Sequence, residues 1–94
     1  MYGTIAKLKV KPGVIESLKH TMEGQERPPG SIAYYVYHMD SDPNELYVAV
    51  VFESREAYFA NADSPEQHKR YEQMMEWLTT EPEWHDGEII HYEQ

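Results

Sequence analysis

Apolar and polar residues alternate along the first part of the chain, and this period of two predicts a strand with one buried face. The buried face would carry every second residue of segment 2–10, namely Tyr2, Thr4, Ala6, Leu8 and Val10. Two later segments, residues 32–39 and 46–52, are apolar on both faces, which is typical of strands covered on both sides. A short apolar run at residues 89–92 predicts a last strand, after a loop at residues 81–87.

The segments between these strands have the three-to-four-residue spacing of amphipathic helices. After a turn at residues 11–13, the first helical stripe consists of Val14, Ile15, Leu18 and Met22. Residues 52–78 predict two further helices placed end to end. Their stripes are Ala57, Tyr58, Asn61 and Ala62 on the first helix, and His68, Tyr71, Met74, Met75 and Leu78 on the second.

Serine residues mark the starts of these two consecutive helices. The Ser54 hydroxyl can accept a hydrogen bond from a free backbone N–H of the opening turn. The run Ser64-Pro65-Glu66-Gln67 is a stronger signal. Serine caps, proline fits the first helical position, and Gln67 can reach back to the cap. We therefore expect two separate helices here, with any chemical site lying beneath them.

The predicted order of elements is β-α-β-β-α-α-β, which indicates an α+β, ferredoxin-like sandwich made by a single domain of residues 1–94. Helices can cover only one face of such a sheet. The second strand must place either Tyr35 and Tyr37 or Tyr34 and Val36 on the other face. That face would be apolar and uncovered, which implies a partner. We expect a second copy of the chain to pack against it, sheet to sheet, as a homodimer.

Composition narrows the classes of partner and of chemistry. The 94 residues have a formal net charge of −9, which argues against binding to nucleic acid or to anionic membrane surfaces. There is no cysteine, so disulfides and thiolate chemistry are excluded. No apolar run is as long as a membrane span and the N-terminus lacks a signal-peptide pattern, so we expect a cytoplasmic protein. A segment of the calcium-loop type begins at Asp40, but Glu45 and Val51 stand where such a loop needs glycine and glutamate. The histidine spacing supports no other metal site.

Three polar side chains of the two consecutive helices are candidates for catalysis: Asn61, His68 and Tyr71. Asn61 could bind a substrate oxygen, or it could cap the end of the first helix. His68 is the natural general base by its pKa, although histidines one turn into a helix are often surface residues. Tyr71 is central to the apolar stripe, where lining a cavity and packing in a core look alike. Although tyrosines on strands more often serve packing, the expected substrate contacts are Tyr35, Tyr37, Tyr58 and Met75.

Four segments resemble the antibiotic biosynthesis monooxygenase-like (ABM) superfamily: GTIAKLKVKPG, the central strand pair, SREAYFANADSP and EPEWHDGEI. The resemblance covers nearly the whole chain. It implies a dimeric α+β barrel of two ferredoxin-like protomers packed through their sheets, in agreement with the argument from the uncovered face. It also implies a pocket between the helices and the sheet. Enzymes of the superfamily include cofactor-independent oxygenases of polycyclic aromatic quinols, haem-degrading enzymes and quinol monooxygenases.

The chain departs from two of these groups within the two consecutive helices. Many quinol-type members carry a histidine in the first helix and then a Ser-Pro-His turn, where this chain has Asn61 and Glu66. Haem-degrading members have tryptophan at the position of Asn61 and an axial histidine at the position of Tyr71, so haem degradation is disfavoured. An asparagine and a tyrosine facing an apolar pocket are closer to the cofactor-free oxygenases. These bind, deprotonate and orient an electron-rich phenol that reacts with dioxygen itself.

Two functions are open at this point. The first is a homodimeric monooxygenase that uses neither metal nor flavin and acts on a small aromatic phenol or quinol. His68 or Tyr71 would assist deprotonation, and Asn61 would orient the ring oxygen. The second is a non-catalytic dimer of the same fold that binds a hydrophobic small molecule or serves in a stress response. The missing histidine pair favours the second function. A fold shared by many reactions does not identify the substrate.

Overall fold

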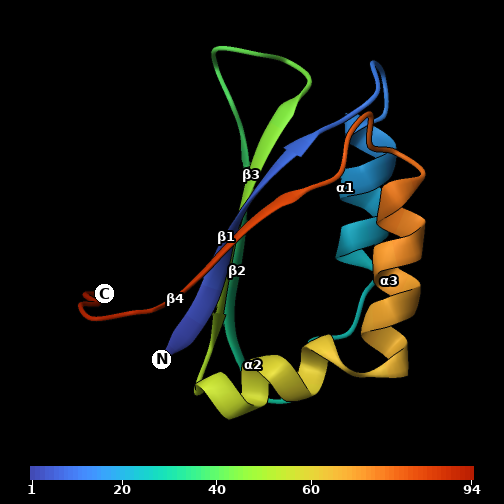
Figure 1. The fold of residues 1–94 in the computed structure, drawn as a ribbon. Helices are drawn as coiled ribbons and strands as arrows, with labels where there is room; N and C mark the ends of the chain where they lie inside the picture. Colours follow the sequence, from blue (N-terminus) through green and yellow to red (C-terminus); the bar gives the residue numbers. More distant parts are fainter.

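Three helices cover one face of a four-stranded antiparallel sheet in the computed structural model, which describes residues 1–94 (Figure 1). In chain order the elements are β1 Tyr2–Lys9, α1 Ile15–Glu23, β2 Ser31–His38, β3 Glu45–Phe52, α2 Arg55–Ala62, α3 Pro65–Met75 and β4 Glu83–Glu88. The order of strands across the sheet is β2-β3-β1-β4. α1 and α3 stand on the same side of the sheet, and α2 lies across one end of it (Figure 1). This is the α+β, ferredoxin-like arrangement that the sequence predicts.

The core lies between the sheet and the helices, on the face that the alternation of β1 predicts to be buried. Its main cluster of buried apolar residues consists of Ala6, Leu8, Val10, Leu18, Leu46, Val48 and Leu78. In the β1–β3 ladder Ala6 is opposite Val48, which keeps their side chains on the same face of the sheet. Leu18 comes from α1, and Leu78 follows α3 and forms an isolated bridge with Val10. The bridge anchors the chain after α3 to the end of β1.

Both predicted serine caps are present. Ser54 Oγ and Ser64 Oγ each accept a hydrogen bond from the backbone N–H three residues on, at 3.0 and 3.1 Å. The expectation that Gln67 reaches back to the cap is wrong. The Ser64 N–H already donates to the Asn61 carbonyl at 3.0 Å, so Gln67 Oε1 accepts from Asn61 and Arg70 instead. All three helices are short, and none has the length and apolar character needed to cross a membrane.

The last strand lies earlier in the chain than the sequence predicts. β4 is Glu83–Glu88, where we expected a loop, and the predicted strand at residues 89–92 is not formed. The β1–β4 ladder ends with Glu88 opposite Tyr2, the first residue of β1. β4 is a polar edge strand, so its conformation comes from pairing with β1 and not from an apolar pattern of its own. Ile90, which belonged to the predicted strand, is 92% exposed.

The face of the sheet turned away from the helices is apolar and uncovered. Ile5, Tyr35 and Tyr37 on this face are 55%, 54% and 55% exposed. Tyr34 and Val36 line the space under the helices, which decides between the two arrangements that the sequence leaves open. We call this surface the open sheet face. The residues that form its apolar part on β1, β2 and β3 are Ile5, Tyr35, Tyr37, Tyr47, Ala49 and Val51, and Lys7 lies beside them.

Candidate functional site

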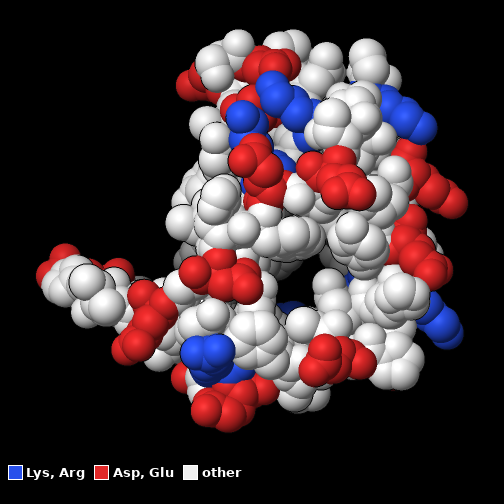
Figure 2. Space-filling view, in the orientation of Figure 1, with Lys and Arg blue, Asp and Glu red and all other residues white.

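A cavity of about 550 Å³ lies between the helices and the sheet. All four strands and all three helices contribute to its walls, which are mostly apolar. Figure 2, in the orientation of Figure 1, shows a hollow between the sheet and the helices, with acidic side chains around it. Cavities of this size and character are typical of sites for small organic molecules. The cavity lies beneath α2 and α3, where the sequence places a candidate site.

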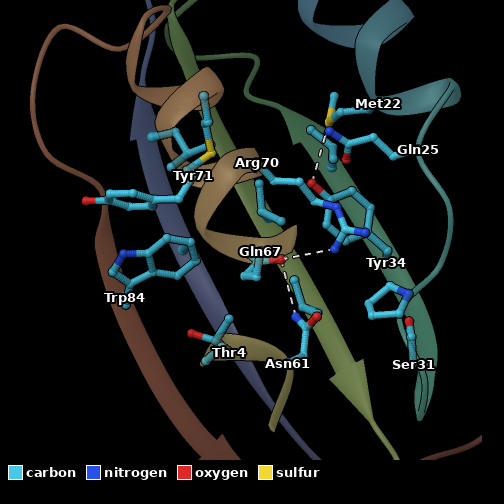
Figure 3. A pocket seen from close by; sticks show the side chains of 18 of the residues that line it. Thr4, Met22, Gln25, Ser31, Tyr34, Asn61, Gln67, Arg70, Tyr71 and Trp84 are labelled. Carbon is cyan, nitrogen blue, oxygen red and sulfur yellow. Dashed lines mark hydrogen bonds between the residues drawn. The ribbon is translucent and has the colours of Figure 1, made fainter. Parts of the chain in front are cut away.

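Asn61 and Gln67 form an amide pair at the junction of α2 and α3. Asn61 is in the last turn of α2 and Gln67 in the first turn of α3, so the break between the helices brings the two side chains together. Asn61 Nδ2 donates to Gln67 Oε1 at 3.3 Å (Figure 3). The Asn61 side chain does not cap α2, because its amide is bonded to Gln67, and the backbone carbonyl of Asn61 accepts from the Ser64 hydroxyl at 2.8 Å instead. The amide therefore stays in the cavity wall, where a ligand can reach it.

Arg70 extends the amide pair by one helical turn. Its Nη1 donates to the same Gln67 Oε1 at 3.3 Å, and its Nη2 donates to the Glu26 carbonyl at 3.4 Å. In Figure 3 the side chain reaches from α3 toward Tyr34 on β2. A half-buried guanidinium thus lines the cavity, held only by two long hydrogen bonds to uncharged oxygens.

A second polar pair is formed by Tyr58 of α2 and Asp86 of β4. The Tyr58 hydroxyl donates to Asp86 Oδ1 at 2.8 Å. The Tyr58 ring packs edge-on against Tyr2 and Phe52, with centroid distances of 5.3 and 5.6 Å. Burial, and then the hydrogen bond to Asp86, raises the pKa of Tyr58 to about 12. Tyr58 therefore remains a hydrogen-bond donor at neutral pH and holds the Asp86 carboxylate at the cavity wall.

Tyr58 is expected to ionise at a higher pH than an exposed tyrosine does. Its folded-state pKa of about 12 lies above the unfolded value of about 10, so the folded protein keeps this proton longer than the unfolded chain does. Its contribution to stability is therefore complete below about pH 10 and is lost as the pH rises from about 10 toward 12. Phenolate absorbance should show one tyrosine that ionises above about pH 11 in the wild type and is missing in Tyr58→Phe. A difference curve centred near pH 10 would count against this assignment.

Thr4 places an unpaired hydroxyl in the wall of the cavity. The residue is 5% exposed, and its Oγ1 has no hydrogen-bond partner. It lies near enough to Tyr58 to lower the pKa of that tyrosine in part, although the two groups do not meet in hydrogen-bond geometry. Buried polar groups are nearly always paired. An unpaired hydroxyl that lines a cavity therefore marks a place where a bound molecule can form a hydrogen bond.

The structure brings Tyr58, Asn61 and Tyr71 into the cavity wall and places His68 at its rim. The His68 side chain is 72% exposed and pairs with Glu72 at 2.8 Å, four residues along α3. This is the geometry of a histidine on a solvated helix face, so His68 does not have the position of a buried general base. No group of three or more His, Asp or Glu side chains is arranged to hold a metal ion.

Three of the expected substrate contacts lie away from the cavity. Tyr35 and Tyr37 are on the open sheet face, because successive side chains of β2 alternate between the two faces. Met75 packs against the core cluster and does not line the cavity. Their neighbours Tyr34 and Met74 do line it. For a ligand bound here, these two residues replace the expected contacts.

The cavity wall also contains polar and aromatic residues that were not predicted as site residues, among them Thr4, Gln67, Arg70, Trp84 and Asp86. Gln67, Arg70 and Met74 follow helical spacing, so the face of α3 that carries Met74 is a signal that could have identified the first two. Trp84 and Asp86 lie two residues apart on β4, so their side chains are on the same face of the sheet. They could be identified only after the pairing of β4 with β1 was known, because the surrounding sequence reads as a loop.

A sheet covered by helices on one face, with a cavity between the two layers, defines a small ferredoxin-like domain. Residues 1–74 match the antibiotic biosynthesis monooxygenase (ABM) family. The chain therefore belongs to this family, and the resemblance noted in the sequence is confirmed. No curated protein matches the chain in sequence.

Several solved structures share the fold at low sequence identity. A candidate antibiotic biosynthesis monooxygenase from Nitrosomonas europaea has a TM-score of 0.79 at 18% identity, over 97% of this chain and 100% of that chain. One from Deinococcus radiodurans has a TM-score of 0.80 at 13% identity, over 100% of this chain and 97% of that chain. One from Chloroflexus aurantiacus has a TM-score of 0.73 at 23% identity, over 97% of this chain and 96% of that chain. At these identities the likeness shows the fold alone.

Proposed function

We propose that this protein is a monooxygenase that oxidises a small aromatic phenol or quinol in the cavity, without a bound metal or flavin. Membership of the family supports a monooxygenase. The observation that carries the choice of substrate is one mostly apolar cavity with two separate polar pairs, Asn61–Gln67 and Tyr58–Asp86, in its wall. Apolar walls hold a flat ring system, and a few polar groups fix its orientation.

In this proposal the protein binds, orients and deprotonates, and the substrate supplies the electrons. The Asn61 amide donates to the ring oxygen. Loss of a proton makes the phenol electron-rich enough to react with dioxygen. One oxygen atom is added to the ring, the other leaves as water with the phenolic proton and the hydrogen of the attacked ring carbon, and the product is a quinone, so the substrate supplies all four electrons. Asp86 accepts the proton, because its carboxylate lies in the cavity wall, where the Tyr58 hydroxyl holds it, and from this exposed position the proton can pass on to water. Tyr71 lines the wall beside the ring.

Replacing Asn61 with alanine is expected to lower kcat/KM for oxygen uptake by about tenfold or more, because a hydrogen bond to a developing charge is lost. The assay follows dioxygen consumption with a panel of hydroxynaphthalenes and anthrones in air. Asn44→Ala is the matched control. Asn44 lies in the turn before β3, outside the cavity wall, and its side chain makes no hydrogen bond.

The outcomes of this assay separate the proposal from its alternative. Oxygen uptake that falls in Asn61→Ala and persists in Asn44→Ala supports the monooxygenase. Binding of the panel compounds without oxygen consumption contradicts it and supports a non-catalytic binding protein. A rate that is equal in the two variants would remove Asn61 from the mechanism.

We also propose that two copies of the chain pair through the open sheet face. Ile5, Tyr35 and Tyr37 there are each more than half exposed, and tyrosine is enriched at interfaces between subunits. In a monomer, a contiguous apolar surface of the sheet would be exposed to solvent, and monomeric proteins seldom have one.

Tyr37→Glu is expected to weaken the dimer at least about tenfold, because it buries an unpaired charge at the interface. Ser17→Glu is the control, since it adds the same charge on an exposed position of α1, on the opposite side of the sheet. Sedimentation and light scattering at micromolar concentration measure the result. A wild-type protein that is monomeric under these conditions would refute the dimer.

A further inference from the structure

Arg70 is a cation in the cavity that has no anionic partner. The chain has 17 acidic residues against eight lysine and arginine residues, so a carboxylate partner would be easy to supply. Lys9 has two, Asp42 and Glu45. Arg70 forms no ion pair, and its two hydrogen bonds, at 3.3 and 3.4 Å, go to uncharged oxygens.

Comparison with Arg27, the other arginine of the cavity wall, shows how an arginine with a structural role is bonded in this fold. Arg27 Nη2 donates to two backbone carbonyls, at 2.6 Å to Ile32 and 3.2 Å to Ser31, and so ties the loop before β2 to the strand. Arg70 has no bond as short. A guanidinium carries five N–H donors, and Arg70 uses two of them. The others remain free to bind a ligand.

The other polar atoms near Arg70 also offer donors. Gln67 Oε1 is occupied by both Asn61 and Arg70, whereas the N–H groups of the Gln67 amide make no hydrogen bond. Figure 3 shows these three side chains together at the junction of α2 and α3. Thr4 adds a second, independent sign, because its hydroxyl is buried at 5% exposure, lines the same cavity and has no partner. These groups thus offer N–H and O–H donors to a bound molecule, whereas the Asp86 carboxylate in the same wall already accepts a hydrogen bond from Tyr58.

We propose that the ligand of this cavity is an aromatic molecule that carries an ionised oxygen group, a carboxylate or an acidic phenolate, with Arg70 as its counter-ion. This rests on the proposed function, in which the cavity holds an aromatic ring. Guanidinium and anionic oxygen form short, charge-assisted hydrogen bonds, which are about twice as strong as neutral ones. The net charge of −9 repels anions at long range, so the preference comes from Arg70 itself and not from the general field of the protein.

Calorimetric titration of the intact protein at neutral pH tests the proposal with ligands that share one skeleton. These are 1-hydroxy-2-naphthoic acid, its methyl ester, and a dinitro-substituted naphthol whose hydroxyl is ionised at this pH. The acid is expected to bind about tenfold or more tightly than the ester, as a hydrogen bond to a charged group implies. The nitronaphthol shows whether a phenolate serves as well as a carboxylate.

Arg70→Met is expected to abolish the preference for the anion, so that acid and ester bind with equal affinity within about threefold, because the charge-assisted bond to the acid is lost. Lys69→Met is the matched control. It removes the same charge from the adjacent, exposed position of α3 and should keep the preference. Arg70→Lys retains the charge and should keep part of it. If Arg70→Met does not fold, the ratio of the affinities for acid and ester, compared between wild type and Arg70→Lys, still tests the role of Arg70.

Equal affinity of wild type for acid and ester would overturn the role of Arg70 and leave the aromatic cavity intact. A preference that survives in Arg70→Met, or that Lys69→Met removes equally, would overturn it too. Failure of every compound to bind would overturn both this inference and the proposed function. Oxygen uptake with neutral phenols alone would retain the function and reject the anionic ligand.

Discussion

Replacing Gly3 with alanine is expected to lower the free energy of unfolding by about 3 kcal/mol or to prevent folding. An added Cβ would lie 1.9 Å from the Val50 carbonyl oxygen and 3.0 Å from the Val50 carbonyl carbon. Both atoms belong to the backbone of β3, which pairs with β1 along its whole length. The strand cannot move aside without breaking the central ladder of the sheet. Urea unfolding of the purified variant measures the loss.

Gly87→Ala is the matched control for this change. Gly87 is directly opposite Gly3 in the β1–β4 ladder, and a Cβ built on it meets no atom within 4 Å. The two variants therefore make the same chemical change at paired positions of neighbouring strands. Gly87→Ala is expected to change stability by about 0.5 kcal/mol or less. A Gly3 variant as stable as the Gly87 variant would show that the sheet accommodates the side chain.

Phe52→Ala is expected to cost about 3–5 kcal/mol of stability, the usual loss for truncating a buried phenylalanine. Phe52 is 1% exposed and lies at the end of β3, where its ring meets Tyr58 edge-on at 5.6 Å and 83°. It also lines the cavity. The truncation therefore removes apolar burial and enlarges the cavity behind the Tyr58–Asp86 pair. Chemical denaturation gives the change in stability, and ligand titration gives the effect on the site.

Phe59→Ala serves as the comparison, because Phe59 is the other phenylalanine of the chain and is 36% exposed. Its ring packs against Tyr2 and Tyr58. The cost should be smaller than for Phe52 by at least about 1 kcal/mol, since less area leaves water on folding. Equal losses in the two variants would mean that Phe52 is not the more important packing residue.

Most elements of the fold could be predicted because each is encoded by its own stretch of sequence. The alternation of β1 shows its buried face, and Ser54 and Ser64 begin α2 and α3. β4 could not be predicted in the same way. Trp84 is its only large apolar residue, and its backbone is held by pairing with β1. An edge strand of this kind leaves no periodic pattern to read.

The location of the candidate site could be predicted from the sequence, but only some of the residues that form it could be. Asn61, Tyr58 and Tyr71 lie on helix faces whose spacing points inward, and the structure places all three in the cavity wall. His68 follows the same spacing, but at the first turn of α3 its side chain reaches solvent and Glu72. Helical spacing shows which side of a helix a residue occupies, and burial at that position depends on what is packed against it.

By itself, the sequence determined the kinds of element, their order, the serine caps and a sheet with more apolar surface than one layer of helices can cover. Only the tertiary structure decided that Tyr35 and Tyr37 face away from the cavity, that Asp86 meets Tyr58, and that Arg70 lies in the cavity without a carboxylate. The physical reason is the range of the interactions. Caps and periodicity act within a few residues, whereas strand register and the convergence of side chains depend on segments far apart in the chain.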